Sequence, residues 1–257
     1  MSAGRGASGS PPVAGEGART AAGVDKRPDR IAPMFDAIAR RYDLLNRVLS
    51  AGLDQRWRAR AVRSLDLTGR ETVVDLCTGT ADLAIALGAG TGGAARVVGI
   101  DFAGEMLRLG RAKLQRSGLG RRVSLVRADA TRVPLVDGAA DAATVAFGIR
   151  NVEEPHRALS EMHRLVRPGG RIAILEFGMP RLPVVGAAYR WYFRRVLPRL
   201  GSAVSGHGSA YAYLPASVGA FLGPAAFCRL LEEAGFRDAR AVPLQLGIVY
   251  LYEAARA

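Results

Sequence analysis

Apolar residues recur every three or four positions near the start of the chain, which is the spacing of an amphipathic helix. The spacing predicts a helix over residues 31–49, broken near Tyr42, and a second helix over residues 54–64. The apolar positions of the first helix are Ile31, Met34, Phe35, Ile38, Tyr42, Leu45, Val48 and Leu49.

From residue 71 onward, short apolar runs alternate with helical patterns. The runs predict strands at 72–76, 96–101, 123–126, 141–147 and 171–177, with helices at 81–88, 103–116 and 154–165. A turn at 167–170, a helix at 225–235 and two closing strands at 236–243 and 247–253 complete the pattern. Strands that alternate with helices form parallel βαβ units. The predicted fold is therefore α/β, a doubly wound, mostly parallel Rossmann-like sheet covered on both faces.

The chain carries a large excess of positive charge. Its 257 residues include 36 Lys and Arg against 23 Asp and Glu, a formal net charge of +13. Only Lys26 and Lys113 are lysines, and a genome rich in G and C produces the same bias toward Arg. The sign of the charge suggests an anionic partner, either nucleic acid or an acidic membrane surface.

Other features of the composition narrow the class of protein. The hydrophobic content of 49% excludes a wholly disordered chain. Two cysteines, Cys77 and Cys228, cannot build a disulfide framework, and no spacing of Cys or His indicates a metal site. We therefore expect a cytoplasmic protein without a metal. No run reaches the ~18 apolar residues that a membrane span needs.

Three features at the carboxyl ends of successive strands indicate a nucleotide site: a glycine-containing turn and two acidic side chains. Gly79 follows the strand that contains Asp75, and Asp101 ends the next strand, 22 residues after Gly79. This is the separation at which a carboxylate accepts hydrogen bonds from the two ribose hydroxyls. Asp129 follows the third strand, where it could accept from an adenine amino group. Taken singly, Asp101 could be a helix cap and Asp129 a turn former.

The turn after the first strand distinguishes between two kinds of cofactor. Thr80 adds a hydroxyl at the helix start, but Ala81 and Asp82 stand where a dinucleotide site favours glycine and no negative charge. S-adenosylmethionine has a sulfonium and an ammonium group but no phosphate. We therefore expect Asp75 and Asp82 near its methionine end, and an NAD-dependent oxidoreductase becomes the weaker alternative.

Four segments resemble class I S-adenosylmethionine-dependent methyltransferases and, more narrowly, the ubiquinone/menaquinone biosynthesis C-methyltransferase family. The first segment is Met34-Phe35-Asp36 through Arg41-Tyr42-Asp43 to Asn46, followed by Ser50 to Gly52 and by Arg56-Trp57-Arg58. The second is Asp75 through Asp82, and the third is Phe147-Gly148-Ile149-Arg150-Asn151-Val152. The fourth is Arg164 through Gly170 with Glu176-Phe177. The first and third are the most specific to this family, and the resemblance runs from about residue 30 to the last residue.

The resemblance implies transfer of a methyl group from S-adenosylmethionine to a ring carbon of a prenylated hydroquinone. The implied acceptor is demethylmenaquinol; the alternatives are the benzoquinol of ubiquinone synthesis or another aromatic or lipid acceptor. The cofactor positions carried onto this chain are Thr80, Asp101, Asp129 and Ala130. The family often has Ser at the position of Ala146, so that contact is missing here.

Two residues are predicted to act on the acceptor. A ring carbon attacks a methyl group only after a neighbouring hydroxyl has lost its proton. Arg150 follows the fourth strand, and its positive charge would stabilise the phenolate, directly or through water. Tyr42 would orient the proton or relay it. The alternatives are an ion pair of Arg150 with Glu153–Glu154 and ordinary core packing of Tyr42.

Composition and the pattern of predicted elements divide the chain into parts. Residues 1–28 are expected to be a disordered tail and residues 29–257 a single methyltransferase domain. The parts of the domain are an N-terminal helical cap (29–68), a cofactor-binding core (69–178), a lid or substrate segment (179–222) and a closing helix with strands (223–257).

Aromatic and basic residues alternate between residues 182 and 200, as in helices that lie at a membrane surface. Ordinary packing of a lid helix on the sheet is the alternative. We expect peripheral contact with an anionic membrane at the inner face of the cell membrane, and a mobile lid over residues 201–215. The sequence contains no nucleic-acid module and leaves a homodimer open.

Overall fold

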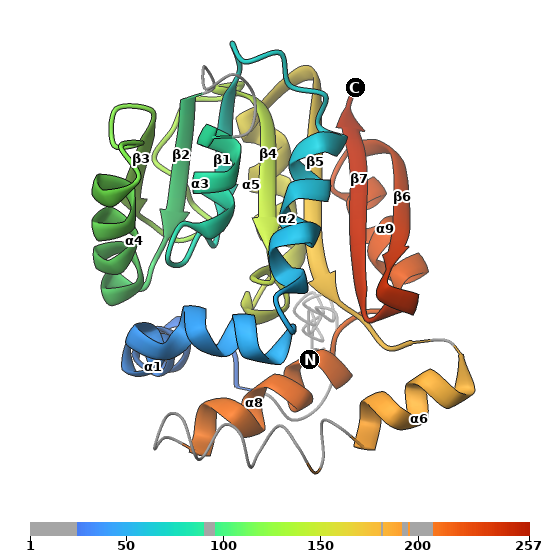
Figure 1. Ribbon diagram of the computed structural model, residues 1–257. Helices are drawn as coiled ribbons and strands as arrows, with labels where there is room; N and C mark the ends of the chain where they lie inside the picture. The colour runs from blue at the N-terminus through green and yellow to red at the C-terminus, as the bar shows by residue number, and fades with distance from the viewer. Residues whose placement is uncertain (1–24, 90–95, 181, 192–194, 196–207) are drawn as a thin grey trace, which may run out of the picture.

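A seven-stranded sheet runs through the computed structural model, which describes residues 25–89, 96–180, 182–191, 195 and 208–257 (Figure 1). Its strands are β1 (Thr72–Leu76), β2 (Arg96–Asp101), β3 (Val123–Arg127), β4 (Ala140–Ala146), β5 (Val166–Phe177), β6 (Phe236–Leu244) and β7 (Val249–Arg256). The order is β3-β2-β1-β4-β5-β7-β6, in which β1 to β5 are parallel and β7 is antiparallel to both of its neighbours. The predicted doubly wound, mostly parallel sheet is confirmed.

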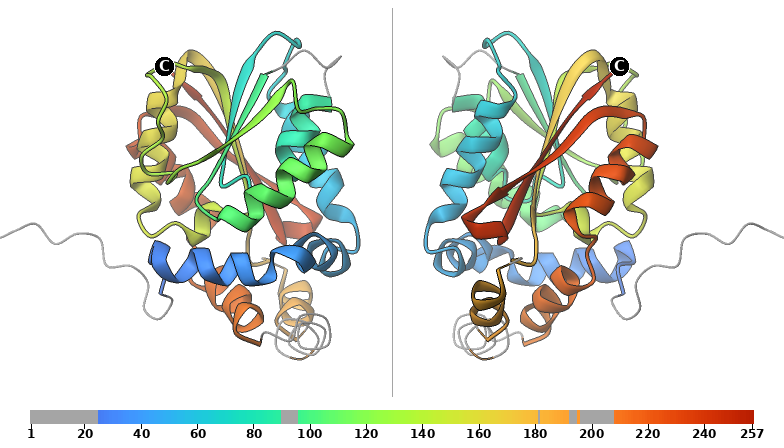
Figure 2. Two further views of the ribbon diagram at one scale, coloured as in Figure 1. Left: turned by 90° about the vertical axis from the view of Figure 1, so that its left-hand side faces the viewer. Right: turned by 90° about the vertical axis from the view of Figure 1, so that its right-hand side faces the viewer.

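Helices cover both faces of this sheet (Figure 2). They are α1 (Pro28–Leu49), α2 (Leu53–Ser64), α3 (Asp82–Ala89), α4 (Gly104–Arg116), α5 (Pro155–Leu165), α6 (Pro183–Trp191), α8 (Gly208–Gly219) and α9 (Pro224–Glu233), with the short 3-10 helices η1 (Ile149–Asn151) and η3 (Gln245–Gly247). Helices α2, α3 and α4 lie on one face, and α5 and α9 lie on the other. Four of the described helices, α1, α5, α6 and α9, begin with proline, whose fixed φ suits the first helical position.

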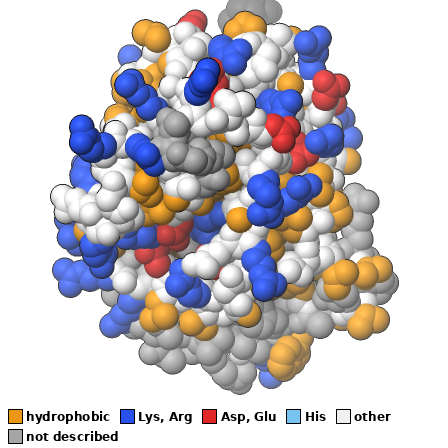
Figure 3. Space-filling model, turned by 45° about the horizontal axis from the view of Figure 1, so that its top comes forward, with side chains coloured by type: hydrophobic (Ala, Val, Ile, Leu, Met, Phe, Trp, Pro, Cys, Tyr) orange, Lys and Arg blue, Asp and Glu red, His pale blue; other side chains and the backbone are white. Residues whose placement is uncertain are grey.

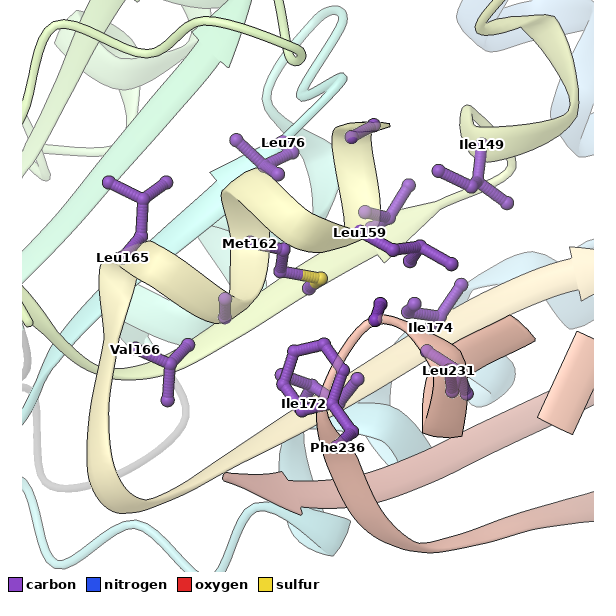
Figure 4. Packing of buried hydrophobic residues seen from close by; sticks show 14 of the residues in the cluster. Leu76, Ile149, Leu159, Met162, Leu165, Val166, Ile172, Ile174, Leu231 and Phe236 are labelled. Atoms are coloured by element: carbon purple, nitrogen blue, oxygen red, sulfur yellow. The ribbon is translucent and has the colours of Figure 1, made fainter. Parts of the chain in front are cut away.

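Close packing of aliphatic side chains holds the helices on the sheet. On one face, Leu159 and Met162 of α5 pack over Ile172 and Ile174 of β5, with Phe236 beside them (Figure 4). On the other, Trp57 of α2 joins Leu87 and Leu175 in a second buried cluster. The strands are therefore buried on both faces, which fixes their carboxyl ends relative to one another.

The carboxyl ends of the parallel strands meet α1, α6 and α8 at the lower edge in Figure 1. Helix α1 is continuous over 22 residues, so the predicted break near Tyr42 is wrong. Its continuity follows from its packing against α4, where Ala39 meets Ala103 and Met106 in a small buried cluster. Helix α1, which belongs to the predicted N-terminal cap, therefore lies over the carboxyl ends of the strands, where a ligand is expected.

Two further expectations changed in the structure. The turn at 167–170 lies inside β5 as an irregularity, because Val166 pairs with Ala140 while Arg171 pairs with Ala142. Residues 208–219, which overlap the expected lid, form the helix α8, whose Tyr213 and Ser217 bond to η1. The rest of that lid, at 201–207, and the tail at 1–24 lie outside the described residues.

Within the described ranges, no single helix is long and apolar enough to cross a bilayer. The bent pair Tyr213–Gly219 and Pro224–Glu233 passes such a test by length and composition alone.

Candidate active site

The loop that joins β1 to α3 lies at the centre of the site. Its backbone turns through left-handed conformations, with φ of 53° at Cys77, 57° at Gly79 and 68° at Ala81. The N–H of Thr78 donates to the carbonyl of Ile100 at 2.9 Å, which ties the loop to β2. Apart from its two chain neighbours, no atom of the described residues lies within 4 Å of the position that a Cβ on Gly79 would occupy, so a ligand can approach this backbone closely.

Asp101 stands at the end of β2 with its carboxylate against this loop. One oxygen accepts the N–H of Gly79 at 2.8 Å and the other accepts the N–H of Ala103 at 2.9 Å. Burial raises the pKa of this carboxyl above its usual range. These two bonds fix the carboxylate, and each oxygen keeps capacity to accept a further bond from a sugar hydroxyl.

Asp75 supports the loop from inside the sheet. Its carboxylate accepts the hydroxyl of Thr78 at 2.6 Å and the hydroxyl of Thr144 at 2.7 Å. Burial raises the pKa of Asp75 to about 6. Asp75 lines neither of the two cavities at this edge of the sheet, so it lies behind the loop and not on the surface that a ligand would contact.

Thr80 also turns away from the cleft, into a charged cluster that we call the α1 latch: Asp43, Thr80, Asp82 and Lys113. The Thr80 hydroxyl donates to Asp43 at 2.6 Å, and the Lys113 ammonium donates to Asp43 at 2.9 Å and to Asp82. The expectation that Asp82 lies beside a bound methionine group loses support, because Lys113 already neutralises this carboxylate.

Two neighbouring cavities follow the carboxyl ends of the strands. The smaller is lined by Tyr42, Gly79 and Asp101, and the larger, of about 200 Å³, by Asp129 and Ala130. Both are lined by Cys77, Phe102, Asn151 and Val152. The structure thus brings together five predicted site residues from α1 and from three different strand ends.

Asp129 and Tyr42 line different cavities and have different neighbours. One Asp129 oxygen accepts both the N–H and the hydroxyl of Thr131, at 2.7 and 2.8 Å, which shapes the turn after β3. Tyr42 lies edge-to-face on Phe35 with ring centroids 6.0 Å apart, and burial raises the pKa of its phenol. Tyr42 lines the smaller cavity, and its hydroxyl also interacts with the Asn46 side chain.

Arg150 is buried in the 3-10 helix η1, directly before Asn151 in the sequence. Its Nη1 donates to Glu176 at 2.7 Å and to the carbonyl of Phe147, and its backbone N–H donates to Glu176 at 3.2 Å. The guanidinium also lies 5.4 Å from the ring centroid of Phe177. Arg150 therefore does form an ion pair, but with Glu176 of β5 and not with Glu153 or Glu154, the partners in the alternative interpretation.

Several lining residues were not predicted from the sequence. Phe102 and Asn151 line both cavities, and the Asn151 amide oxygen accepts the hydroxyl of Tyr213 from α8 at 3.1 Å. Lys26 lines the larger cavity from the segment before α1. Asn151 could have been found from its place beside Arg150, whereas nothing in the periodicity indicates Lys26.

The donor set fits S-adenosylmethionine. An anchored carboxylate at Asp101, an open glycine backbone at Gly79 and a carboxylate at Asp129 offer acceptors and space for a nucleoside. Among the residues that the structure describes, no group of three His, Cys, Asp or Glu could hold a metal ion.

Comparison with known proteins also indicates a methyltransferase, over nearly the whole chain. The model of the ubiE/COQ5 methyltransferase family matches residues 24–256. The chain is 45% identical over 229 residues to the "Ubiquinone/menaquinone biosynthesis C-methyltransferase UbiE" of Geobacter sp. (strain M21), covering 89% of this chain and 97% of that protein. It is 49% identical over 203 residues to the "Demethylmenaquinone methyltransferase" of Thermus thermophilus, covering 79% and 91%.

Solved structures share the fold at low identity. A methyltransferase from Thermotoga maritima, described as S-adenosylmethionine-dependent, superposes with a TM-score of 0.62 at 18% identity, covering 89% of this chain and all of that chain. One from Aquifex aeolicus gives 0.56 at 21% identity, covering 77% and 87%.

The prediction of a class I S-adenosylmethionine-dependent methyltransferase is confirmed by this match in sequence and in fold. The chain belongs to the ubiE/COQ5 methyltransferase family.

Proposed function

We propose that this protein transfers a methyl group from S-adenosylmethionine to a ring carbon of a prenylated hydroquinone, with demethylmenaquinol as the acceptor. The observation that carries the proposal is the position of the Phe147–Asn151 segment. Asn151 lines both cavities and directly follows Arg150, which we expect to act on the acceptor. The segment that contains both residues therefore borders the cavities in which we place the cofactor. The 49% identity to a demethylmenaquinone methyltransferase supports the naphthoquinol as the ring system.

Each cofactor residue has a separate task in this proposal. The Asp101 carboxylate accepts the ribose hydroxyls, and Asp129 accepts the adenine amino group beside Ala130. The backbone of Gly79 lies against the methionine part. Asp75 and Thr80 act indirectly, because their hydrogen bonds shape and hold the loop that carries Gly79.

The cofactor supplies a methyl group made electrophilic by its sulfonium, and the protein must supply an activated ring carbon. A phenolate is stabilised by fixed positive charge and by hydrogen-bond donors in a site that excludes water. Arg150 supplies part of this field, while the Glu176 carboxylate at 2.7 Å offsets part of its charge. The protonated Tyr42 supplies a donor from α1.

We also propose that α6 brings the enzyme to the membrane that contains the prenyl chain. Val184, Ala187 and Trp191 recur at the i, i+3, i+7 spacing of one helix face, and all three are exposed. Leu182 and Met179 are exposed just before this helix. An exposed apolar face of this kind favours contact with an apolar partner.

An assay with labelled S-adenosylmethionine and two reduced acceptors, kept free of oxygen, tests the proposed reaction. We expect label in the demethylated naphthoquinol and much less in the corresponding benzoquinol. Asp101→Ala is expected to weaken S-adenosylmethionine binding roughly 10- to 100-fold, because hydrogen bonds to a charged acceptor are lost. Label in the benzoquinol alone would show that the benzoquinol is the acceptor. Label in neither acceptor would refute the proposed reaction.

A further inference from the structure

Helix α8 sets two polar side chains against η1, the 3-10 helix that contains Arg150 and Asn151. Tyr213 and Ser217 are four residues apart and therefore lie on one face of α8. The Tyr213 hydroxyl donates to Oδ1 of Asn151 at 3.1 Å. Nε of Arg150 donates to Oγ of Ser217 at 3.4 Å. One helix face thus contacts both residues of the segment that borders the cavities.

Asn151 occupies a position where the orientation of its side chain matters. It is 8% exposed and lines both the cavity of Tyr42 and Gly79 and the cavity of Asp129. A side-chain amide has an acceptor at its oxygen and two donors at its nitrogen, and a half-turn exchanges their places. The orientation of this amide therefore decides whether it offers a donor or an acceptor to a bound molecule.

Two contacts favour one orientation of the Asn151 amide. Burial raises the pKa of Tyr213 to about 12, so its hydroxyl keeps the proton that it donates to Oδ1. On the other side, Nδ2 donates to the carbonyl oxygen of Phe147 at 3.4 Å. The reversed amide would place its oxygen against this carbonyl oxygen, and neither atom could donate. The Tyr213 hydroxyl and the Phe147 carbonyl thus select the same orientation.

We propose that Tyr213 is a positioning residue, whose hydroxyl holds the Asn151 oxygen toward α8 and so leaves one N–H of Nδ2 to donate to the acceptor's ring oxygen. This inference rests on the proposed function, because it assigns a donor to that substrate. Tyr213 lines neither of the two cavities, so it acts through Asn151. A fixed donor at the ring oxygen stabilises the negative charge that forms there as the phenolate appears.

Kinetics of Tyr213→Phe, Asn151→Ala and the double variant test this assignment. We expect Tyr213→Phe to lower kcat about 3- to 10-fold, the loss typical of one hydrogen bond between neutral groups. KM for the acceptor and Kd for S-adenosylmethionine should change little, because the donor binds the charged oxygen more strongly than the neutral one.

The double variant shows whether Tyr213 acts through Asn151. In the Asn151→Ala background, Tyr213→Phe should have no further effect on kcat, because the hydroxyl has no amide left to orient. If Tyr213→Phe lowers kcat by the same factor in both backgrounds, Tyr213 does not act through Asn151 and the proposal is wrong.

Asn151→Asp tests the donor itself. A carboxylate has nearly the shape of the amide and still accepts the Tyr213 hydroxyl, but it has no N–H. We expect this variant to be at least as slow as Asn151→Ala. Turnover at the wild-type rate would overturn the proposal. So would a loss of affinity for S-adenosylhomocysteine as large as the loss of turnover, because the N–H would then bind the cofactor.

Tyr250→Phe is the matched control, since Tyr250 of β7 is also buried but lines neither cavity. Its kinetics should equal those of the wild type. Denaturant unfolding of each variant separates a structural role from a positioning role. If Tyr213→Phe unfolds more easily but keeps the wild-type kcat, the hydroxyl only holds α8 in place and the proposal is wrong.

A measurement by NMR needs no turnover. The side-chain amide resonance of Asn151, identified by its absence in Asn151→Asp, should move in Tyr213→Phe and stay in place in Tyr250→Phe. An unchanged resonance in Tyr213→Phe would overturn the positioning role. If the wild type methylates no naphthoquinol, the proposed function fails, while this resonance still decides whether Tyr213 orients the amide.

Discussion

Arg150 and Glu176 form an ion pair that water hardly reaches, with 5% and 0% of their surfaces exposed. We expect Arg150→Ala to lower the free energy of unfolding by about 3–5 kcal/mol, because it leaves the Glu176 carboxylate buried without a partner. Adding Glu176→Gln should recover much of this loss, since an amide costs less to bury. Denaturant unfolding of the three proteins measures this effect. A fully stable Arg150→Ala would contradict the burial of the pair.

The double variant also separates stability from chemistry at this residue. A folded Arg150→Ala/Glu176→Gln enzyme should turn over far more slowly than the wild type while it binds S-adenosylmethionine with similar affinity. Equal turnover would remove Arg150 from the mechanism.

Asp75 gives the protein a pH dependence of stability. Burial raises the pKa of Asp75 from 3.8 to about 6, so the folded state binds an extra proton between these two pH values. The contribution of Asp75 is therefore fully present below pH ~4 and is lost as the pH rises through 6, by at most about 1.4 kcal/mol per pH unit. Unfolding measured from pH 4 to pH 7 should show this slope, and the slope should be smaller in Asp75→Asn.

At the scale of elements, the α1 latch joins α1 to α4 and to the start of α3. We expect Lys113→Met to destabilise the protein by about 1–2 kcal/mol, between the values for exposed and for buried pairs, because Asp43 and Asp82 lose their shared cation. Hydrogen exchange should rise in α1 first, and S-adenosylmethionine should bind more weakly.

Arg108→Met on the same helix is the control for the latch. The Arg108 guanidinium pairs with Glu105 in solvent, and its side chain is 51% exposed. Equal protection of α1 in Lys113→Met and Arg108→Met would show that the latch does not hold the cap.

The elements of the sheet could be predicted because each apolar run and each helical period reports burial directly. The strands at 72–76 and 96–101 have the predicted bounds. Helix α8 was missed because its glycine and serine residues resemble a loop, whereas tertiary bonds from Tyr213 and Ser217 to η1 hold it. Local composition does not report such bonds.

The candidate site was predictable where a residue follows a strand. Gly79, Asp101 and Asp129 could be placed because parallel strands end at one edge of the sheet. The partners of Arg150 and Thr80 could not, since Glu176 and Asp43 come from elements 26 and 37 residues away. Which of two nearby carboxylates pairs with a cation depends on tertiary distances that the spacing does not contain.

At the scale of the whole molecule, the net charge of +13 can be compared with the arrangement of basic side chains. On the upper front of the molecule, which Figure 3 shows, basic side chains are scattered with acidic ones between them, and they do not form one stripe. A groove for nucleic acid would require such a stripe. The charge is better suited to general attraction toward an anionic surface.

Vesicle binding tests the proposed membrane contact. We expect the protein to bind vesicles with anionic lipids, less strongly as salt rises, because screening weakens attraction between charges. Val184→Ser with Trp191→Ser should weaken binding further, since it removes the exposed apolar face of α6. Replacing Val136, 76% exposed and outside α6, by Ser is the control. Equal binding to neutral vesicles at every salt concentration would refute the electrostatic part.

The place of β7 has a consequence for how the sheet is completed. Strand β7 lies between β5 and β6, although it follows both in the sequence. Among the described strands, β6 pairs with β7 alone, so it joins the sheet through Val249–Arg256. Whenever β7 detaches, both strand edges of β6 become open to pairing with other chains. The sheet is thus completed out of chain order, and a change that weakens β7 also releases β6.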